Sequence, residues 1–236
     1  MTDPTYVLLH SPLVGPASWE PVAEALKLQG FEVLVPRIVD REPPYWRSYA
    51  HQAAEAITDL ALDADGEVVL VAHSGAGTLV AVIADISIAK VTRIVFVDAT
   101  LPHDSWTRLD EMAAHDAEFA RGIESDLRAG MRYPDWTAEQ IAPLIPDDDR
   151  RDALLAEVQA RGLDFFTEPI PAPGWPPGAD GPRCAYLQFS AAYAASAEDA
   201  ERLGWSVGRI EAGHFHPLVE PDVVANVIVR LSEGPE

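Results

Sequence analysis

A single serine, Ser74, stands where the hydrophobic pattern of the chain changes its period. Residues 68–71 form a continuous apolar run, which predicts a short strand buried on both faces. From Leu79 onward the apolar residues recur at helical spacing, so the chain must turn from strand to helix around Ser74. Such a sharp turn needs small neighbours, and Ala72 and Ala76 lie two residues to either side. A serine in this position is a candidate nucleophile for acyl transfer.

A serine hydroxyl is a poor nucleophile at neutral pH, so it needs a base within hydrogen-bond reach and an acid that orients the base. His214 and His216, close to the end of the sequence, are the candidate bases. Asp98, at the end of the apolar run RIVFVD, is a candidate acid, and Asp199 is another. Asp98 could instead only cap a turn. A metal site at the two histidines is disfavoured because no further ligands cluster at a recognised spacing.

The stretch EVVLVAHSGAGTLV resembles the nucleophile elbow of the α/β-hydrolase fold family, with alanines replacing the outer glycines of its GxSxG motif. The stretches HSPLVGPASW and VFVDATLPHD resemble the plant methylesterase and hydroxynitrile lyase branch of that family. The family usually carries its catalytic histidine after a glycine in the loop following the last strand. The resemblance therefore implies that His214, which follows Gly213, is the base, and that His216 is a neighbour of the base or lines the pocket.

The position of the acid departs from the common family pattern. Most members carry it just after the strand that precedes the histidine, but here that segment is FSAAYAASAED. Ala191, Ala192 and Tyr193 stand where an aspartate is expected, and Asp199 lies farther into a helix. Related haloalkane dehalogenases place their acid at the strand end that Asp98 occupies here. The resemblance thus favours Asp98.

An oxyanion hole requires donors directed at the oxygen on which negative charge develops, and the backbone N–H of Gly75 is expected to be one of them. The family takes the second donor from the loop after the first strand. In this chain that loop contains His10, Ser11 and Pro12, and proline has no N–H to donate. The second donor must then be the backbone or hydroxyl of Ser11 or the N–H of Leu13.

Alternating strands and helices with short turns predict an α/β protein with a doubly wound, mostly parallel sheet. Ligands of such sheets bind beyond the carboxyl ends of the strands, and His10, Ser74 and Asp98 all lie at predicted strand ends. The fold expected from the resemblance is the α/β-hydrolase fold, as a single domain over residues 1–236.

Residues from about 101 to 183 interrupt this alternation. They contain helical stretches around 110–128 and 150–162 and then the segment PIPAPGWPPGADGP, which has too much proline and glycine for either element. We interpret them as a helical cap inserted after the strand that ends at Asp98. Its aromatic residues, among them Trp106, could line an apolar pocket.

The composition narrows the choice of partners and compartment. With 17 basic and 38 acidic residues the formal charge is −21, which makes nucleic acid or an anionic membrane an improbable partner. The single cysteine, Cys184, cannot form an internal disulfide. The sequence has neither a leader pattern nor a stretch apolar enough to span a bilayer, so we expect a cytoplasmic protein. We also expect a monomer or homodimer that uses no cofactor or metal.

The leading hypothesis is a serine hydrolase acting on an ester, thioester or lactone with an apolar or aromatic acyl group. Ser74 would attack, His214 would take and return the proton, and Asp98 would orient the imidazole. A lyase or cyclase that uses the same side chains, or a receptor with a retained triad, are the alternatives. The cyanohydrin lyases of the family use a lysine near the histidine, and no lysine follows Lys90. Dehalogenases and epoxide hydrolases carry an aspartate in place of Ser74. Cyanohydrin lyase, dehalogenase and epoxide hydrolase activities are therefore all disfavoured.

Overall fold

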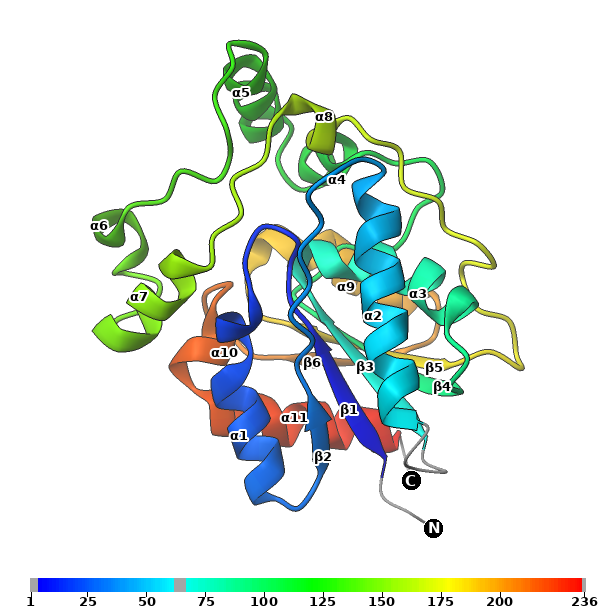
Figure 1. Ribbon diagram of the computed structural model, residues 1–236. Coiled ribbons are helices and arrows are strands. Elements are labelled where there is room, and N and C mark those ends of the chain that lie inside the picture. The colour runs from blue at the N-terminus through cyan, green and yellow to red at the C-terminus, as the bar shows by residue number, and fades with distance from the viewer. Residues whose placement is uncertain (1–3, 62–66, 235–236) are drawn as a thin grey trace.

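The computed structural model describes residues 4–61 and 67–234, and the strands among them form one parallel sheet. The order of the strands is β2-β1-β3-β4-β5-β6, and all neighbouring pairs run parallel (Figure 1). The strands are β1 (Thr5–Leu9), β2 (Glu32–Leu34), β3 (Val68–His73), β4 (Val91–Val97), β5 (Arg183–Gln188) and β6 (Ser206–Arg209). The predicted parallel α/β architecture is confirmed.

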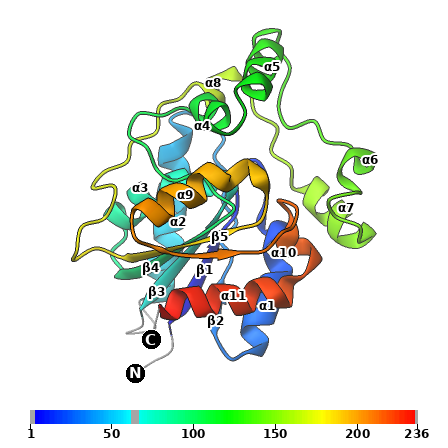
Figure 2. The same ribbon diagram turned by 180° about the vertical axis from the view of Figure 1, so that it is seen from behind.

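Helices cover both faces of this sheet (Figures 1 and 2). One face packs against α1 (Glu20–Leu28) and α11 (Pro221–Glu233), and the other against α2 (Tyr45–Ala61), α3 (Val80–Ile86) and α9 (Ala194–Arg202). In β3, Val69 and Val71 belong to the first core and Val68 and Leu70 to the second. Because side chains of a strand alternate between faces, a strand covered on both sides is a continuous apolar run, as its sequence indicates.

The strand order reverses at β1, which has β2 on one side and β3 on the other. In an open parallel sheet, the connections that leave two such strands diverge to opposite faces and open a crevice at the carboxyl ends. The loop after β1 and the turn after β3 therefore border the place where a ligand is expected to bind.

The segment between β4 and β5 lies beyond this carboxyl edge of the sheet (Figure 1). Its helices are α4 (Arg108–His115), α5 (Ala117–Arg128), α6 (Ala138–Ile141), α7 (Asp148–Ala156) and α8 (Leu163–Phe166). Small apolar clusters join it to the rest of the protein. In one cluster, Ile145 and Leu154 pack with Val14, Phe215 and Leu218.

The helix expected around residues 110–128 is in fact two helices that meet at Asp116. The backbone of Asp116 is extended, with φ −152° and ψ 100°, and its carboxylate accepts the N–H groups of Glu118 and Phe119, both at 3.0 Å. An aspartate that bonds the N–H groups two and three residues ahead starts a new helix. Apolar periodicity alone does not reveal this break. None of the described helices is long and apolar enough to cross a bilayer.

Candidate active site

The turn at Ser74 joins β3 to a short 3₁₀ helix, Ser74–Leu79, which continues into α3. Ser74 has φ 59°, a left-handed conformation that costs energy for a residue other than glycine. Gly77 allows the turn to approach the loop after β4, since a Cβ there would lie 2.3 Å from the carbonyl oxygen of Thr100. The hydroxyl of Ser74 is thus held above the carboxyl end of β3 by a turn that the surrounding packing imposes.

Asp98 and His214 form the second part of the site. Asp98 follows β4, is fully buried, and its Oδ2 lies 2.8 Å from His214 Nδ1. Its Oδ1 accepts the backbone N–H groups of Phe189 and Ser190 at 2.9 and 3.0 Å, and Oδ2 also accepts the Ser190 hydroxyl at 2.7 Å. Burial alone would raise the pKa of Asp98, but the bonds from His214, Phe189 and Ser190 hold that pKa below its usual value. The carboxylate is therefore ionised and fixes the hydrogen of His214 on Nδ1, which leaves Nε2 as the basic nitrogen.

Two other rings fix the plane of the His214 imidazole. His73, the residue before Ser74, stacks on it at 4.5 Å between ring centroids, and Tyr193 stacks at 5.1 Å. His73 Nε2 also lies 3.0 Å from the carbonyl oxygen of His214, and burial lowers the pKa of His73 to about 3. A neutral ring that must donate to a carbonyl carries its hydrogen on Nε2. His73 therefore holds both the backbone and the ring of His214.

The other candidates for base and acid lie elsewhere. Asp199 forms an ion pair with Arg202 on α9. His216 is buried with its ring 5.2 Å from that of Phe189, and its Nε2 lies 3.4 Å from a carboxylate oxygen of Glu220. Neither Asp199 nor His216 lines a cavity that contains Ser74.

Two cavities meet at Ser74. The larger has a volume of about 400 Å³ and is lined mainly by apolar side chains. These include Leu13, Val14, Met112, Phe119, Tyr133, Trp136, Ile141, Leu144 and Phe215. His214 lines the same cavity. The smaller has a volume of about 80 Å³ and lies between Gly75, Thr100, Arg108 and Phe165.

Trp106 does not line either of these cavities. Its ring stacks on His103 at 3.8 Å, and its backbone pairs with Ile170 in an isolated antiparallel bridge. The expectation that Trp106 contributes to the pocket is not met, because its ring packs on His103 instead. Other aromatic residues of the segment, such as Trp136, take that place.

His10 is fully buried and holds the loop after β1 in place. Its Nε2 accepts the N–H of Ile38 at 3.3 Å, so the ring hydrogen is on Nδ1, which donates to the carbonyl of Ser11 at 2.9 Å. The hydroxyl of Tyr49 donates to the carbonyl of His10 at 2.5 Å. Burial lowers the pKa of His10, so the ring is neutral at pH 7. His10 lines neither cavity, and its contacts give it a positioning role.

Ser11 and Leu13, in contrast, line both cavities. The N–H of Leu13 lies 3.4 Å from Ser11 Oγ, which is a long hydrogen bond. Because the hydroxyl of Ser11 is the acceptor in this bond, its own hydrogen is free to donate to another group. The Ser11 hydroxyl is also near the elbow, 3.7 Å from the position that a Cβ of Gly75 would occupy.

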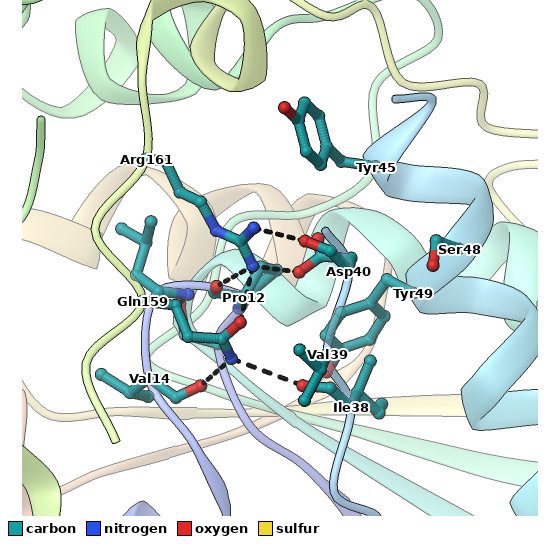
Figure 3. A network of polar contacts seen from close by, with 12 residues as sticks. Pro12, Val14, Ile38, Val39, Asp40, Tyr45, Ser48, Tyr49, Gln159 and Arg161 are labelled. Atoms are coloured by element: carbon teal, nitrogen blue, oxygen red, sulfur yellow. Dashed lines mark hydrogen bonds and ion pairs between the residues drawn. The ribbon is translucent and has the colours of Figure 1, made fainter. Parts of the chain in front are cut away.

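An extended strap that follows α7, residues 159–161, holds this loop from the other side (Figure 3). The backbone N–H of Gln159 donates to the carbonyl of Leu13 at 2.9 Å, and its side-chain amide donates to the carbonyl of Val14 at 2.9 Å. Arg161 donates to the carbonyl of Pro12 at 3.3 Å and forms a buried ion pair with Asp40. The strap is thus bonded to three successive carbonyl groups of the loop.

Arg108 of α4 holds the turn at Ser74 in a similar way. Its Nη1 donates to the carbonyl of Gly75 at 2.6 Å and to the hydroxyl of Thr78 at 2.7 Å. Glu111, which is also buried, neutralises the charge of Arg108, with its Oε2 3.0 Å from Arg108 Nη1.

The described residues contain no group of three or more His, Cys, Asp or Glu side chains that could hold a metal ion.

A model of the Alpha/beta hydrolase family matches residues 6–227, nearly the whole sequence. The chain belongs to this family. A search among curated proteins found no match.

Solved structures of several other proteins share the fold. An extracellular alpha/beta-hydrolase from a Paenibacillus species, described as homologous in structure and function to tobacco salicylic acid binding protein 2, has a TM-score of 0.74 at 17% identity over 97% of this chain and 99% of that one. A pyrethroid hydrolase from Sphingobium faniae JZ-2 gives 0.67 at 16% identity over 99% of both chains. Tomato methylketone synthase I, in complex with 2-tridecanone, gives 0.66 at 14% over 100% of both.

Several residues of this hydrolase-fold site carry no signal in the sequence that would identify them. Tyr193 lies in the segment where an aspartate is expected, and its hydroxyl is 3.3 Å from Ser74 Oγ. Ser190, three residues earlier in the same segment, bonds to Asp98. His73 could have been noticed as the neighbour of Ser74, but its contact with His214 joins residues 141 positions apart. Arg108 is an ordinary charged residue until the fold brings it to Gly75.

Proposed function

We propose that this protein is a serine hydrolase that cleaves a small carboxylic ester, thioester or lactone through an acyl-enzyme on Ser74. The observation that carries the proposal is the shared cavity: Ser74 and His214 line it together, and Asp98 Oδ2 is 2.8 Å from His214 Nδ1. A buried carboxylate, an imidazole with a free Nε2 and a serine on a sharp turn are the three groups that acyl transfer requires.

In the proposed reaction, His214 Nε2 removes the hydrogen of Ser74 as Oγ attacks the carbonyl carbon, and Asp98 stabilises the imidazolium. The negative charge moves to the carbonyl oxygen, where the N–H of Gly75 and the hydroxyl of Ser11 are the proposed donors. The imidazolium then protonates the leaving group, which departs. Water repeats the sequence on the acyl-enzyme with His214 as base, releasing the acid and restoring the Ser74 hydroxyl.

The unequal cavities support an unsymmetrical substrate. The apolar cavity of about 400 Å³ fits an apolar or aromatic group. The cavity of about 80 Å³ has room for only a few non-hydrogen atoms, since one water molecule fills about 30 Å³ in the liquid. We therefore propose an ester with a bulky apolar group on one side of the scissile bond and a small group on the other.

An active-site probe tests the reaction class. An alkyl fluorophosphonate should label the wild-type protein at Ser74, and peptide mass spectrometry should locate the adduct. Ser74→Ala should abolish the labelling and His214→Asn should slow it by at least about 10³-fold, because the hydroxyl then lacks its base. A folded wild-type protein, verified by circular dichroism, that resists the probe would instead support a ligand-binding receptor.

A small panel of esters tests the substrate class. Naphthyl acetate and methyl naphthylacetate each carry one small group, on the acyl and the alcohol side respectively, and at least one of them should be hydrolysed. Naphthyl naphthylacetate, which is bulky on both sides, should react at least about tenfold more slowly. One of its two naphthyl groups would have to enter the small cavity, which has no room for it. Equal rates for all three esters would contradict the unsymmetrical site.

A further inference from the structure

Tyr193 contacts the nucleophile, although acyl transfer by serine, histidine and aspartate has no obvious need for it. Its hydroxyl oxygen lies 3.3 Å from Ser74 Oγ. Its ring is nearly parallel to that of His214, with an angle of 7° between the planes and 5.1 Å between the centroids. His115 also contacts the phenol ring, with 4.5 Å between the centroids and an angle of 51° between the planes. Tyr193 is therefore packed against two imidazoles, and its hydroxyl lies within hydrogen-bond distance of the serine.

Asp98 determines the position of Tyr193 as well as that of His214. The carboxylate binds the backbone N–H and the hydroxyl of Ser190, which fixes the start of the loop after β5. The next residues, Ala191–Tyr193, form one turn of 3₁₀ helix, and the N–H of Tyr193 bonds to the carbonyl of Ser190 at 3.3 Å. One buried carboxylate thus orients two groups that line a cavity with Ser74: the imidazole from the loop after β6 and the phenol from the loop after β5.

The phenol is in a state to donate. Burial raises the pKa of Tyr193 well above its usual value, so the hydroxyl keeps its hydrogen at neutral pH. If that hydrogen is directed at Ser74 Oγ, the hydrogen of Ser74 itself must point elsewhere, and His214 Nε2 is the base that can accept it. The contact between Tyr193 and Ser74 then prepares the serine for deprotonation.

We propose that Tyr193 is a catalytic residue that donates a hydrogen bond to Ser74 Oγ throughout the reaction. The proposal rests on the hydrolase function proposed above. Negative charge develops on Oγ when His214 removes its hydrogen, and again when Oγ leaves the second tetrahedral intermediate during deacylation. A hydrogen bond to a charged oxygen is stronger than one to a neutral oxygen, so the Tyr193 bond stabilises both transition states more than the ground state. Tyr193 keeps its own hydrogen in both steps.

The variant Tyr193→Phe removes only the hydroxyl and keeps the ring against His214 and His115. With p-nitrophenyl acetate as substrate, the burst of p-nitrophenol reports acylation and the steady state reports deacylation. Both rate constants should fall about tenfold, and the substrate concentration for a half-maximal burst rate should change little, because the bond strengthens only as charge develops. The same variant should react about tenfold more slowly with an alkyl fluorophosphonate.

Tyr6→Phe is the matched control, because it removes another buried tyrosine hydroxyl, one that bonds to Ser232 far from the site. It should leave both rate constants unchanged. Tyr193→Leu, which also removes the stacked ring, should lose more activity than Tyr193→Phe. Thermal unfolding of each variant separates loss of rate from loss of folded protein.

The outcomes distinguish this inference from the proposed function. If Tyr193→Phe acylates and deacylates as fast as the wild-type protein, the hydroxyl has no catalytic role. The same conclusion follows if Tyr6→Phe loses as much rate as Tyr193→Phe. If the probe labels Ser74 in the wild-type protein and labels Tyr193→Phe at the same rate, only the inference about Tyr193 fails. If the folded wild-type protein is not labelled at Ser74, the hydrolase proposal and the inference both fail.

Discussion

Asp98 illustrates how much a single buried side chain can organise. Its two oxygens accept bonds from His214, from the backbone of Phe189 and from both donors of Ser190. Such a carboxylate is stable as an anion only because these donors replace the water lost on burial. Removing its charge while keeping its shape should therefore affect the orientation and the charge of His214 more than the fold.

We predict that Asp98→Asn lowers kcat for ester hydrolysis by about 10³- to 10⁴-fold, because an amide in this position can favour the wrong tautomer of His214 and cannot stabilise the imidazolium. Asp199→Asn is the control, since Asp199 pairs with Arg202 outside the site. Steady-state kinetics of both variants give the measurement. A large loss in Asp199→Asn with little change in Asp98→Asn would show that the acid has been misassigned.

At this scale the sequence identifies residues whose chemistry is visible in their type and local pattern. Ser74, Asp98 and His214 are candidates because each follows a predicted strand and can act in acyl transfer. Tyr193 and Arg108 cannot be selected in this way, because their hydrogen bonds to the turn join residues 119 and 33 positions apart. The opposite holds for His216 and Trp106. Their residue types suit a catalytic or binding site, but His216 contacts Glu220 and Trp106 stacks on His103, away from Ser74.

The strap of residues 159–161 connects the helical segment between β4 and β5 to the loop after β1. It follows α7, and it binds the carbonyl groups of the loop that contains Ser11 and Leu13 (Figure 3). Its anchor is the ion pair between Arg161 and Asp40, with only 8% and 1% of the side chains exposed. Burial raises the pKa of Asp40 to about 6, against the attraction of Arg161, which lowers it.

We predict that Arg161→Met lowers the free energy of unfolding by about 3–5 kcal/mol at pH 7.5, because it leaves the carboxylate of Asp40 buried without its partner. Without Arg161 the pKa of Asp40 rises further. The loss should therefore shrink as the pH is lowered from 7.5 to 5, because Asp40 takes up a proton at a higher pH in the variant than in the wild-type protein, where its pKa is about 6. Urea denaturation at both pH values measures it.

Arg132→Ala provides the comparison for this prediction. Arg132 is exposed and donates to the carbonyl of Ala160, so it contacts the same strap from the solvent side. Its loss should cost less than about 1 kcal/mol. If Arg161→Met is no less stable than Arg132→Ala, the buried pair does not anchor the strap.

The sequence predicts the strands and the helices that flank the sheet because their apolar periods are imposed by burial on the sheet. Prediction is weaker between β4 and β5, where helices are short and contact the rest of the protein through small clusters. The break at Asp116 depends on one side chain bonding to the backbone ahead of it, and the strap is irregular chain fixed by distant partners. Neither feature has a period that could reveal it.

The whole molecule combines a strongly acidic composition with several buried neutral histidines. The net charge is −21, yet burial lowers the pKa of His10, His73, His103, His115 and His216. The unfolded chain binds protons at these residues below about pH 6.5, whereas the folded protein binds them only at a lower pH. Acid should therefore favour unfolding. Burial raises the pKa of Asp40 to about 6 and also raises that of Glu111, so the folded protein takes up a proton at Asp40 from about pH 6 downward, which partly opposes this trend.

We predict that the free energy of unfolding falls as the pH is lowered from 7.5 to 5.5, and that His73 accounts for a definable part of the decrease. Its pKa is about 3 in the folded protein and about 6.5 in the unfolded chain. Between these values each pH unit favours the unfolded state by about 1.4 kcal/mol, so this one residue should lower the free energy of unfolding by about 1.4 kcal/mol at pH 5.5.

His73→Gln should show a correspondingly smaller slope of the free energy of unfolding against pH in urea denaturation. His51→Asn, which removes an exposed histidine of α2, should keep the wild-type slope. An unchanged slope in His73→Gln would mean that the ring beneath His214 accepts a proton in the folded protein, and it could not then serve as a neutral support for the imidazole.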